Sequence, residues 1–237
     1  TMITNRLGLS DNSFVVEIAS NDGYLLKNFV SSGIPCLGIE PTKSTAAAAS
    51  AIGVPVRQEF FGKNMGLSMA NAGEQADLVL GNNVFAHVPD INDFTEGVAA
   101  LLKPNGVVTF EFPHLLQLIP QNQFDTIYHE HFSYLSLCSV SSIFKAAGLR
   151  AFDVEELKTH GGSLRVYGCR GDASHKETSL VQNMLTHEIQ AGMQDEKTYS
   201  AFQKRADKVK DGLVSFLLEA KAEGKTVAGY GAAAKGN

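Results

Sequence analysis

The stretch VVEIASNDGYLL, residues 15–26, decides the fold. Its apolar and β-branched start predicts a short buried strand over 14–19, and the polar residues SNDG (20–23) predict a tight turn. The residues that follow, YLLKNFVSSG (24–33), are compatible with a helix. A strand, a glycine-containing turn and a helix in this order are typical of open α/β sheets, which bind ligands at the carboxyl ends of their strands.

The alternation of strand and helix continues along the chain. Further strands are predicted in PCLGIEP (35–41), VPVRQEFF (54–61), ADLVLGNNVFAHV (76–88, leading into a loop) and VVTFEFP (107–113). Helices are predicted in TKSTAAAASAIG (42–53), DINDFTEGVAALLKPNG (90–106, with an N-cap candidate) and SVSSIFKAAG (139–148). A closing antiparallel pair is predicted in LRAFDVEEL (149–157) and GGSLRVYGCR (161–170). The pattern predicts a mostly parallel, Rossmann-like α/β sheet with helices on both faces.

Beyond about residue 172 the sequence becomes long, charged and helical, in SLVQNMLTHEIQAG (179–192) and in 199–225. The final residues, TVAGYGAAAKGN (226–237), have the pattern of the first strand and glycine turn of a second Rossmann-like unit. We therefore expect one domain over 1–170, followed over 171–237 by a helical segment and the start of another domain.

Composition limits the classes of function. The chain has 237 residues, 44% of them apolar, and a net charge of −5, which argues against a protein that coats nucleic acid or an anionic membrane. The three cysteines, Cys36, Cys138 and Cys169, form no C-x-x-C pair, so neither a disulfide framework nor a cysteine zinc site is predicted. No apolar run approaches the ~20 residues of a membrane span, and we expect a soluble, cytoplasmic protein.

The turn after the first strand suggests a ligand without a phosphate group. A dinucleotide site requires G-x-G-x-x-G, but this turn has a single glycine. About twenty residues on, Glu40 ends the second strand, at the position from which a carboxylate accepts hydrogen bonds from ribose hydroxyls. NAD and S-adenosylmethionine both carry such a ribose, and exposed strand-end acids remain the simpler alternative. The cofactor-site candidates here are Glu17, Ala19, Ser20, Asn21, Gly23 and Glu40.

The segment YHEHFSYLSL (128–137) places two histidines around a glutamate. A metal site, a group of acid–base catalysts and a solvated polar loop are all compatible with these residues. The spacing of His129, Glu130 and His131, with His87 elsewhere, matches neither H-E-x-x-H nor a cysteine–histidine site, so no metal is predicted. If the segment is extended, His129 and His131 face one way and Tyr128 and Glu130 the other, unless the backbone turns.

Together, EIASNDG (17–23), GIE (38–40), ADLVLGNNVFAHV and LLKPNGVVTFEFP (101–113) resemble the class I S-adenosylmethionine-dependent methyltransferases. The resemblance implies an enzyme of that fold with S-adenosylmethionine as its cofactor. It also implies that Asn82 and Asn83 contact the methionine part of the cofactor. Phe61, with Phe60, is a candidate to flank adenine, and core or loop packing is the equal alternative for both rings.

More narrowly, EIASNDGYLL, NNVFAHVPD (82–90), FDTIYHEHFSYLS (124–136) and GYGAAAKGN (229–237) resemble the sugar C-methyltransferases that act on nucleotide-linked 4-ketodeoxysugars. Methylation of such a carbon requires a base that forms an enolate and a polar group that stabilises it. The resemblance implies His131 as the base, with Tyr128, Glu130 and His87 in supporting roles, and a nucleotide sugar as the partner.

This resemblance covers residues 14 to 237. Family members usually begin with a cysteine-rich zinc domain and end with a complete Rossmann-like domain, and we expect both to be missing from this chain. Further candidates for substrate contact are His114 after EFP and Arg165, although a strand-edge arginine is the ordinary interpretation, and His160 is expected in a turn. An NAD-dependent oxidoreductase and a non-catalytic nucleotide-binding fragment remain alternative functions.

Overall fold

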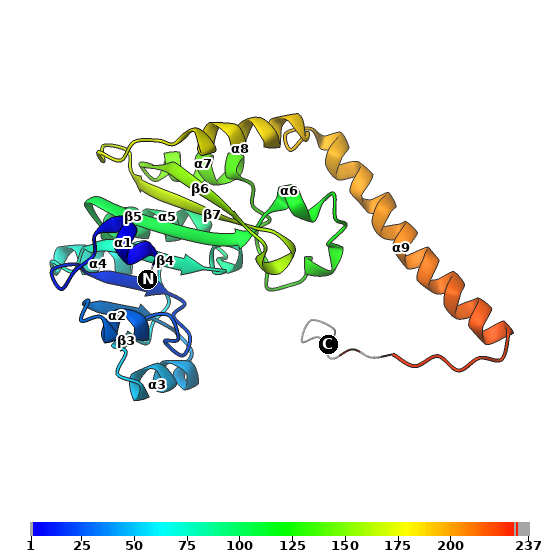
Figure 1. Ribbon diagram of the computed structural model, residues 1–237, viewed down its shortest axis with the longest axis horizontal. Coiled ribbons are helices and arrows are strands. Elements are labelled where there is room, and N and C mark those ends of the chain that lie inside the picture. Colours follow the sequence, from blue (N-terminus) through cyan, green and yellow to red (C-terminus); the bar gives the residue numbers. More distant parts are fainter. Residues whose placement is uncertain (1, 230, 232–237) are drawn as a thin grey trace.

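The computed structural model describes residues 2–229 and 231. Its strands are β1 (Val15–Ile18), β2 (Cys36–Ile39), β3 (Val56–Arg57), β4 (Ala76–Asn82), β5 (Leu102–Pro113), β6 (Leu149–Leu157) and β7 (Ser163–Arg170). Within the described residues they form one seven-stranded sheet with the order β3-β2-β1-β4-β5-β7-β6 (Figure 1). The first five are parallel, whereas β7 is antiparallel to both β5 and β6. The Rossmann-like sheet and its closing antiparallel pair are therefore confirmed.

Helices cover both faces of the sheet. They are α1 (Met2–Leu7), α2 (Lys27–Ser31), α3 (Lys43–Ala51), α4 (Lys63–Asn71), α5 (Ile91–Leu101), α6 (Leu115–Leu118), α7 (Leu137–Ala146), α8 (Ser179–Gln190) and α9 (Glu196–Ala222), with 3₁₀ turns η1 (Phe85–His87), η2 (Phe124–Thr126) and η3 (Thr159–Gly161). Val15 packs with residues of α2 and α3, and the next residue, Val16, packs with residues of α4, α5 and α7. Alternate residues of β1 thus contribute to two apolar cores, as expected for a strand buried on both sides.

The sequence predicted the N-cap of helix α5 but did not predict helix α4. The N-cap of α5 is confirmed, because Asp90 Oδ1 accepts a hydrogen bond from the backbone N–H of Asp93 at 3.0 Å. Helix α4 was not predicted, and its sequence KNMGLSMAN contains a glycine in the interior. A Cβ on Gly66 would lie 2.1 Å from the carbonyl oxygen of Gly97 in α5. The close contact between α4 and α5 explains the glycine and stabilises a helix that propensity alone does not favour.

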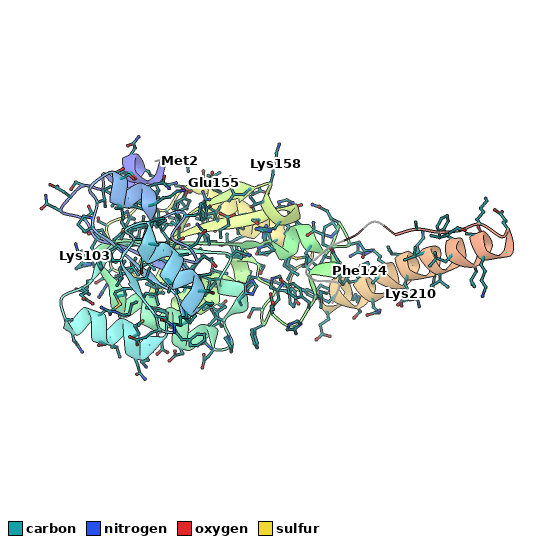
Figure 2. All side chains as sticks on the ribbon, turned by 90° about the horizontal axis from the view of Figure 1, so that it is seen from below. Met2, Lys103, Phe124, Glu155, Lys158 and Lys210 are labelled. Carbon is teal, nitrogen blue, oxygen red and sulfur yellow. The ribbon has the colours of Figure 1, made fainter. Side chains whose placement is uncertain are left out.

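The carboxyl ends of β1, β2, β4 and β5 lie on one edge of the sheet. Figure 2 shows Lys103, near the start of β5, and Phe124, beyond the end of β5, at opposite ends of the body of the molecule. The chain that follows β5, which includes the YHEH segment, therefore lies at the edge where open parallel sheets bind ligands.

The expected helical segment is confirmed as α8 and α9. Helix α8 packs beside β6 and α7, whereas α9 extends away from the body (Figures 1 and 2). The predicted strand at the start of a second Rossmann-like unit does not form over the described residues 225–229, and residues 230 and 232–237 of that prediction lie outside the described residues. In the part of the chain that is described, no helix has both the length and the apolar character needed to cross a membrane.

Candidate functional site

The turn after β1 depends on residues with left-handed backbone conformations. Ala19, Asn21 and Gly23 have φ angles of 57°, 50° and 75°. This conformation is uncommon for residues other than glycine, asparagine and aspartate, so Ala19 is strained. A Cβ on Gly23 would also lie 3.0 Å from side-chain atoms of Ala49 and Val54, so glycine is required here on two counts.

Glu40 holds this turn in place. Its carboxylate is buried, with 4% of the residue exposed, and accepts two backbone hydrogen bonds. The N–H of Asn21 donates to Oε2 at 3.1 Å, and the N–H of Thr42 donates to Oε1 at 2.8 Å. Each carboxylate oxygen accepts more than one hydrogen bond, so capacity for a ribose hydroxyl remains. The alternative interpretation of Glu40, as an exposed strand-end acid, is wrong.

Glu17 is buried without a hydrogen-bond partner on one oxygen. Only 5% of the residue is exposed, and within the described part of the chain Oε2 has no partner. Burial, together with the nearby charge of Asp22, raises the pKa of the Glu17 carboxyl to about 8. A buried acid in this state favours a ligand that brings a positive charge or a hydrogen-bond donor.

Ser20, near Glu17 in the chain, also has a buried polar atom without a hydrogen-bond partner in the described part of the chain. Its Oγ is buried and has no partner among the described residues. A Cβ on Gly38 would lie 2.3 Å from that oxygen, so the glycine in β2 makes room for the hydroxyl. Two unpaired buried polar atoms at the end of one strand indicate a binding site rather than a packed turn.

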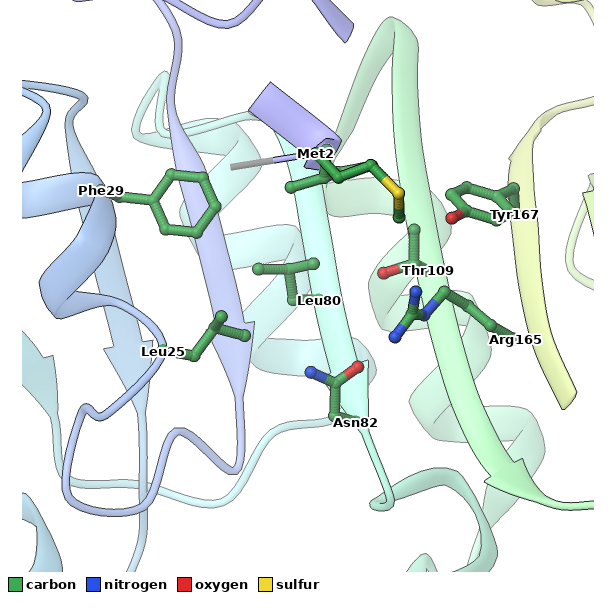
Figure 3. Close-up of a pocket in the computed structure, with 9 residues that line it drawn as sticks. Met2, Leu25, Phe29, Leu80, Asn82, Thr109, Arg165 and Tyr167 are labelled. Atoms are coloured by element: carbon green, nitrogen blue, oxygen red, sulfur yellow. The ribbon is translucent and has the colours of Figure 1, made fainter. Parts of the chain in front are cut away.

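The two asparagines after β4 face different pockets. Asn82 lines a pocket of about 180 Å³ together with Leu25, Leu80, Thr109 and Arg165, and Figure 3 shows it at the carboxyl end of β4. Asn83 has a φ angle of 53° and lines a second pocket of about 490 Å³. The left-handed conformation at Asn83 thus separates the two side chains.

The two phenylalanines after β3 differ in their surroundings. Phe60 is 84% exposed, whereas Phe61 is half-buried and packs edge-on against Phe94 with ring centroids 5.4 Å apart. Phe60 is therefore the ring open to solvent, and the role of Phe61 beside adenine stays a prediction.

The YHEH segment is a turn, so the alternating arrangement expected for an extended segment is wrong. The backbone N–H of His131 donates to the carbonyl of Tyr128 at 3.1 Å, which brings these two side chains together. The Tyr128 hydroxyl lies 3.4 Å from Nε2 of His131, and the ring centroids are 4.5 Å apart. His129 and Glu130 occupy the outside of the turn and are exposed.

His131 is held in one tautomer by a backbone carbonyl. Its Nδ1 lies 2.9 Å from the carbonyl oxygen of Thr126. A carbonyl oxygen only accepts hydrogen bonds, so in the neutral ring Nδ1 carries the proton and Nε2 carries the lone pair. This arrangement, in which one ring nitrogen is anchored and the other faces a pocket, suits a general base.

Two further rings surround His131. His87 of η1 lies edge-on with ring centroids 4.7 Å apart, and Tyr134 lies at 5.9 Å. The N–H of Phe132 donates to the carbonyl of Ala86 at 2.9 Å, which fixes the YHEH turn against η1. Burial raises the pKa of the Tyr134 phenol, so it stays protonated as a hydrogen-bond donor. The structure therefore brings together Tyr128, His131 and His87 and leaves Glu130 at the surface.

The pocket beside His131 includes residues that the sequence patterns did not identify. Its lining residues are Asn83, Pro113, Gln123, Asp125, Thr126, Tyr128, His131, His160 and Gly161. His160 lies in a turn, as expected, with a φ angle of 51°, but it also lines this pocket. The sequence THGG predicts a turn, and the left-handed backbone at His160 that marks it as a candidate site residue is visible only in the structure.

Two candidates for substrate contact have other partners. His114 is 1% exposed, and its Nε2 lies 2.7 Å from Oε1 of Glu188, so the expectation that it contacts substrate is wrong. Arg165 donates to Glu111 at 2.8 Å and to Glu155 at 3.0 Å. These two carboxylates balance its charge, which supports the ordinary interpretation over a phosphate contact. Among the described residues, no group of three His, Cys, Asp or Glu side chains is arranged to hold a metal ion.

Two family models match the chain. One, described as a methyltransferase domain, matches residues 3–154, and the other, described as a C-methyltransferase C-terminal domain, matches residues 158–237. The chain is 40% identical over 236 residues to the C-methyltransferase NovU of Streptomyces niveus, covering 100% of the chain and 56% of that protein. It is 29% identical to a ubiquinone biosynthesis O-methyltransferase of Rhodopseudomonas palustris, over 40% of the chain and 37% of that protein. The chain thus spans about half the length of NovU.

Solved structures share the fold. The YcgJ protein of Bacillus subtilis is similar with a TM-score of 0.55 and 13% identity, over 71% of this chain and 96% of that one. The magnesium protoporphyrin IX methyltransferase of Synechocystis with bound S-adenosylhomocysteine has a TM-score of 0.54 and 12% identity, over 71% of this chain and 78% of that one. At these identities the similarity concerns the fold alone.

Proposed function

The chain belongs to the class I S-adenosylmethionine-dependent methyltransferases, and from this premise we propose that it transfers a methyl group to a carbon next to a ketone, with His131 as general base. The observation that carries the proposal is the fixed tautomer of His131, whose Nδ1 is bonded to the Thr126 carbonyl while Nε2 faces Tyr128. The similarity to a C-methyltransferase supports carbon as the acceptor atom.

The residues after β1 and β2 fit the cofactor. Glu17 offers a buried carboxyl group to the ammonium group of the amino acid part, and Ser20 offers a hydroxyl that has no partner among the described residues. Glu40 holds the turn and keeps acceptor capacity for the ribose. S-adenosylmethionine, when bound, supplies a methyl group on a positively charged sulfur that needs no further activation.

Replacing Glu40 with alanine tests this assignment. Because a hydrogen bond to a charged group contributes about 1.5–3 kcal/mol, we expect the affinity for S-adenosylhomocysteine to fall about tenfold to hundredfold. Isothermal titration calorimetry measures this directly. The exposed Glu59 on the same edge provides a matched control, Glu59→Ala, with unchanged affinity. An unchanged affinity in Glu40→Ala would remove this residue from the cofactor site.

The chemical roles follow from the pocket geometry. Nε2 of His131 accepts the proton from the carbon beside the ketone, and the Thr126 carbonyl stabilises the imidazolium through Nδ1. The Tyr128 hydroxyl lies next to Nε2 and is able to donate to the oxygen on which negative charge develops, and the His87 ring packs beside His131. The fixed turn positions the carbon for attack on the methyl group.

For the acceptor, we propose a nucleotide-diphosphate 4-ketodeoxysugar. The resemblance of FDTIYHEHFSYLS and NNVFAHVPD to enzymes of that group supports this choice. Gln123 and Asp125 at the same pocket are able to bind sugar hydroxyls.

We also propose that the methyltransferase domain ends near residue 170, because β7 is part of the sheet. The three unpaired cysteines support a cytoplasmic location.

Proton exchange tests the proposed reaction without methyl transfer. With S-adenosylhomocysteine bound in D₂O, we expect the full-length protein to replace the hydrogen next to the ketone of 4-keto-6-deoxyhexoses carried by thymidine, guanosine or cytidine diphosphate. Nuclear magnetic resonance follows the loss of that proton signal. Thermal stabilisation by NAD and not by S-adenosylhomocysteine, with no exchange on any of these sugars, would contradict the proposal and favour an oxidoreductase.

A further inference from the structure

Residues 115–136, which we call the catalytic segment, carry Tyr128 and His131 between β5 and α7. The two ends of the segment lie side by side. The N–H of Leu115 donates to the carbonyl of Leu135 at 3.0 Å, and His114 pairs with Leu135 in an isolated β-bridge. The segment is therefore a loop closed at its base, and the pocket residues lie in its distal part.

Glu188 of α8 contacts both sides of this base. Its side chain is 0% exposed, and Oε1 lies 2.7 Å from Nε2 of His114 at the entry to the segment. At the exit, the backbone N–H groups of Leu137 and Cys138 donate to Oε1 at 2.5 Å and to Oε2 at 2.8 Å. These N–H groups belong to the first turn of α7, where a negative charge is stabilised by the helix dipole.

His114 extends the contact to a second wall of the pocket. A carboxylate only accepts hydrogen bonds, so Nε2 of His114 is the donor to Glu188. The backbone N–H of His114 donates to the carbonyl of Gly162 at 3.0 Å. Gly162 directly follows His160 and Gly161, which line the pocket. One carboxylate on α8 is thus connected to both the catalytic segment and the η3 turn.

Apolar packing holds the base of the segment independently of Glu188. Leu116, Leu118, Ile119 and Leu135 are all buried in the main core. Helix α9 adds a further contact, in which Arg205 donates to the carbonyl of Ile119 at 2.9 Å. Loss of the Glu188 contacts is therefore expected to loosen the distal part of the segment while the sheet and its core remain folded.

We propose that Glu188 and His114 are positioning residues, which fix the base of the catalytic segment so that His131 reaches its reacting geometry. This inference rests on the proposed function for His131. A carboxylate that accepts three hydrogen bonds across the two ends of a loop restricts the orientation of the whole loop. Neither residue touches the pocket, so both act through the segment.

The first test compares Glu188→Gln and His114→Leu in the full-length protein. A displacement of about 1 Å at a catalytic group lowers the rate about 100-fold, so we expect kcat to fall by that factor in both variants. The KM for S-adenosylmethionine should stay unchanged, because Glu17 and Glu40 lie on other strands. Glutamine at position 114 keeps a donor where Nε2 lies, so His114→Gln should restore most of the lost kcat. The exposed Glu177 gives a matched control, Glu177→Gln, with wild-type kcat.

Hydrogen–deuterium exchange provides a readout that does not depend on the reaction. We expect faster exchange over residues 121–134 in Glu188→Gln and His114→Leu, and unchanged exchange in β1 and β4. Should Glu188→Gln fail to fold, the leucine and glutamine variants of His114 decide the question. Wild-type kcat together with wild-type exchange in His114→Leu overturns the proposal. If the wild-type protein methylates no ketosugar, the exchange result still decides whether these residues fix the segment, and only the proposed function fails.

Discussion

His131→Asn is expected to lower kcat by about three orders of magnitude while the affinity for S-adenosylhomocysteine stays at the wild-type value. General base catalysis contributes about 10²–10⁴-fold, and the asparagine variant lacks the nitrogen that accepts the proton. The Asn Nδ2 replaces Nδ1 of the histidine and keeps a donor for the Thr126 carbonyl. The turn should therefore survive, so the loss reports on the base alone.

The neighbouring histidine supplies the control. His129 is exposed on the outside of the same turn, and His129→Asn should retain wild-type kcat. Rapid-quench measurement of a single turnover separates methyl transfer from product release. Turnover in His131→Asn within tenfold of wild type, with normal turnover in His129→Asn, would assign the base to another group. The His87 ring, whose centroid lies 4.7 Å from that of His131, would then be the next candidate.

Glu17→Gln is expected to change both protein stability and cofactor binding, with a sign fixed by the pKa of about 8. Below pH 4.5 the carboxyl is protonated in both the folded and the unfolded state, so it does not change the free energy of unfolding. Between pH 4.5 and 8 the unfolded state releases a proton that the folded state keeps, so the free energy of unfolding falls as pH rises. Above pH 8 the carboxyl is ionised in both states, and its burial then lowers the free energy of unfolding by up to roughly 5 kcal/mol. Without cofactor, the glutamine variant should therefore be the more stable protein at pH 8.5.

With cofactor bound, the wild-type protein rather than Glu17→Gln is expected to be the more stable one. The α-ammonium group of the ligand pairs with ionised Glu17, so the affinity of the wild-type protein for S-adenosylhomocysteine should increase with pH up to about 8. In Glu17→Gln the affinity should be low and independent of pH over this range. Calorimetric melting at pH 6 to 8.5, with and without S-adenosylhomocysteine, measures both effects. Asp22→Asn should move the wild-type transition to lower pH, because Asp22 contributes to the raised pKa. Identical pH dependence in wild type and Glu17→Gln would exclude this role.

The fold was predictable from the sequence because its signals are local. A β-branched run, a turn residue and an N-cap such as Asp90 each act within a few positions of the chain, and all strands of the sheet were anticipated. Helix α4 was missed because its glycine reflects contact with α5, which no local pattern reveals. Strand β3 was predicted over 54–61 but forms only at Val56–Arg57, and among the described residues the FF that follows pairs with no strand of the sheet.

The site was predictable only where its residues follow strands directly. Glu17, Glu40, Asn82 and His87 lie at or just beyond strand ends, so their place on the ligand-binding edge followed from topology. The pairing of Tyr128 with His131 required a turn that the sequence left open. Gln123 and His160 line the same pocket because Gln123 Nε2 donates to the carbonyl of Gly161, the residue after His160, at 2.8 Å. Contacts between segments this distant in sequence lie beyond local patterns.

The Glu188 contacts are able to form only late in the synthesis of the chain. A ribosome releases the chain from its N-terminus, and segments fold as they emerge. The turn after β1 and its acceptor Glu40 are separated by 19 residues, so they are able to meet early. Glu188 lies 74 residues beyond His114 and 51 beyond Leu137. The contacts that order the turn after β1 are therefore able to form during synthesis well before those that close the base of the catalytic segment.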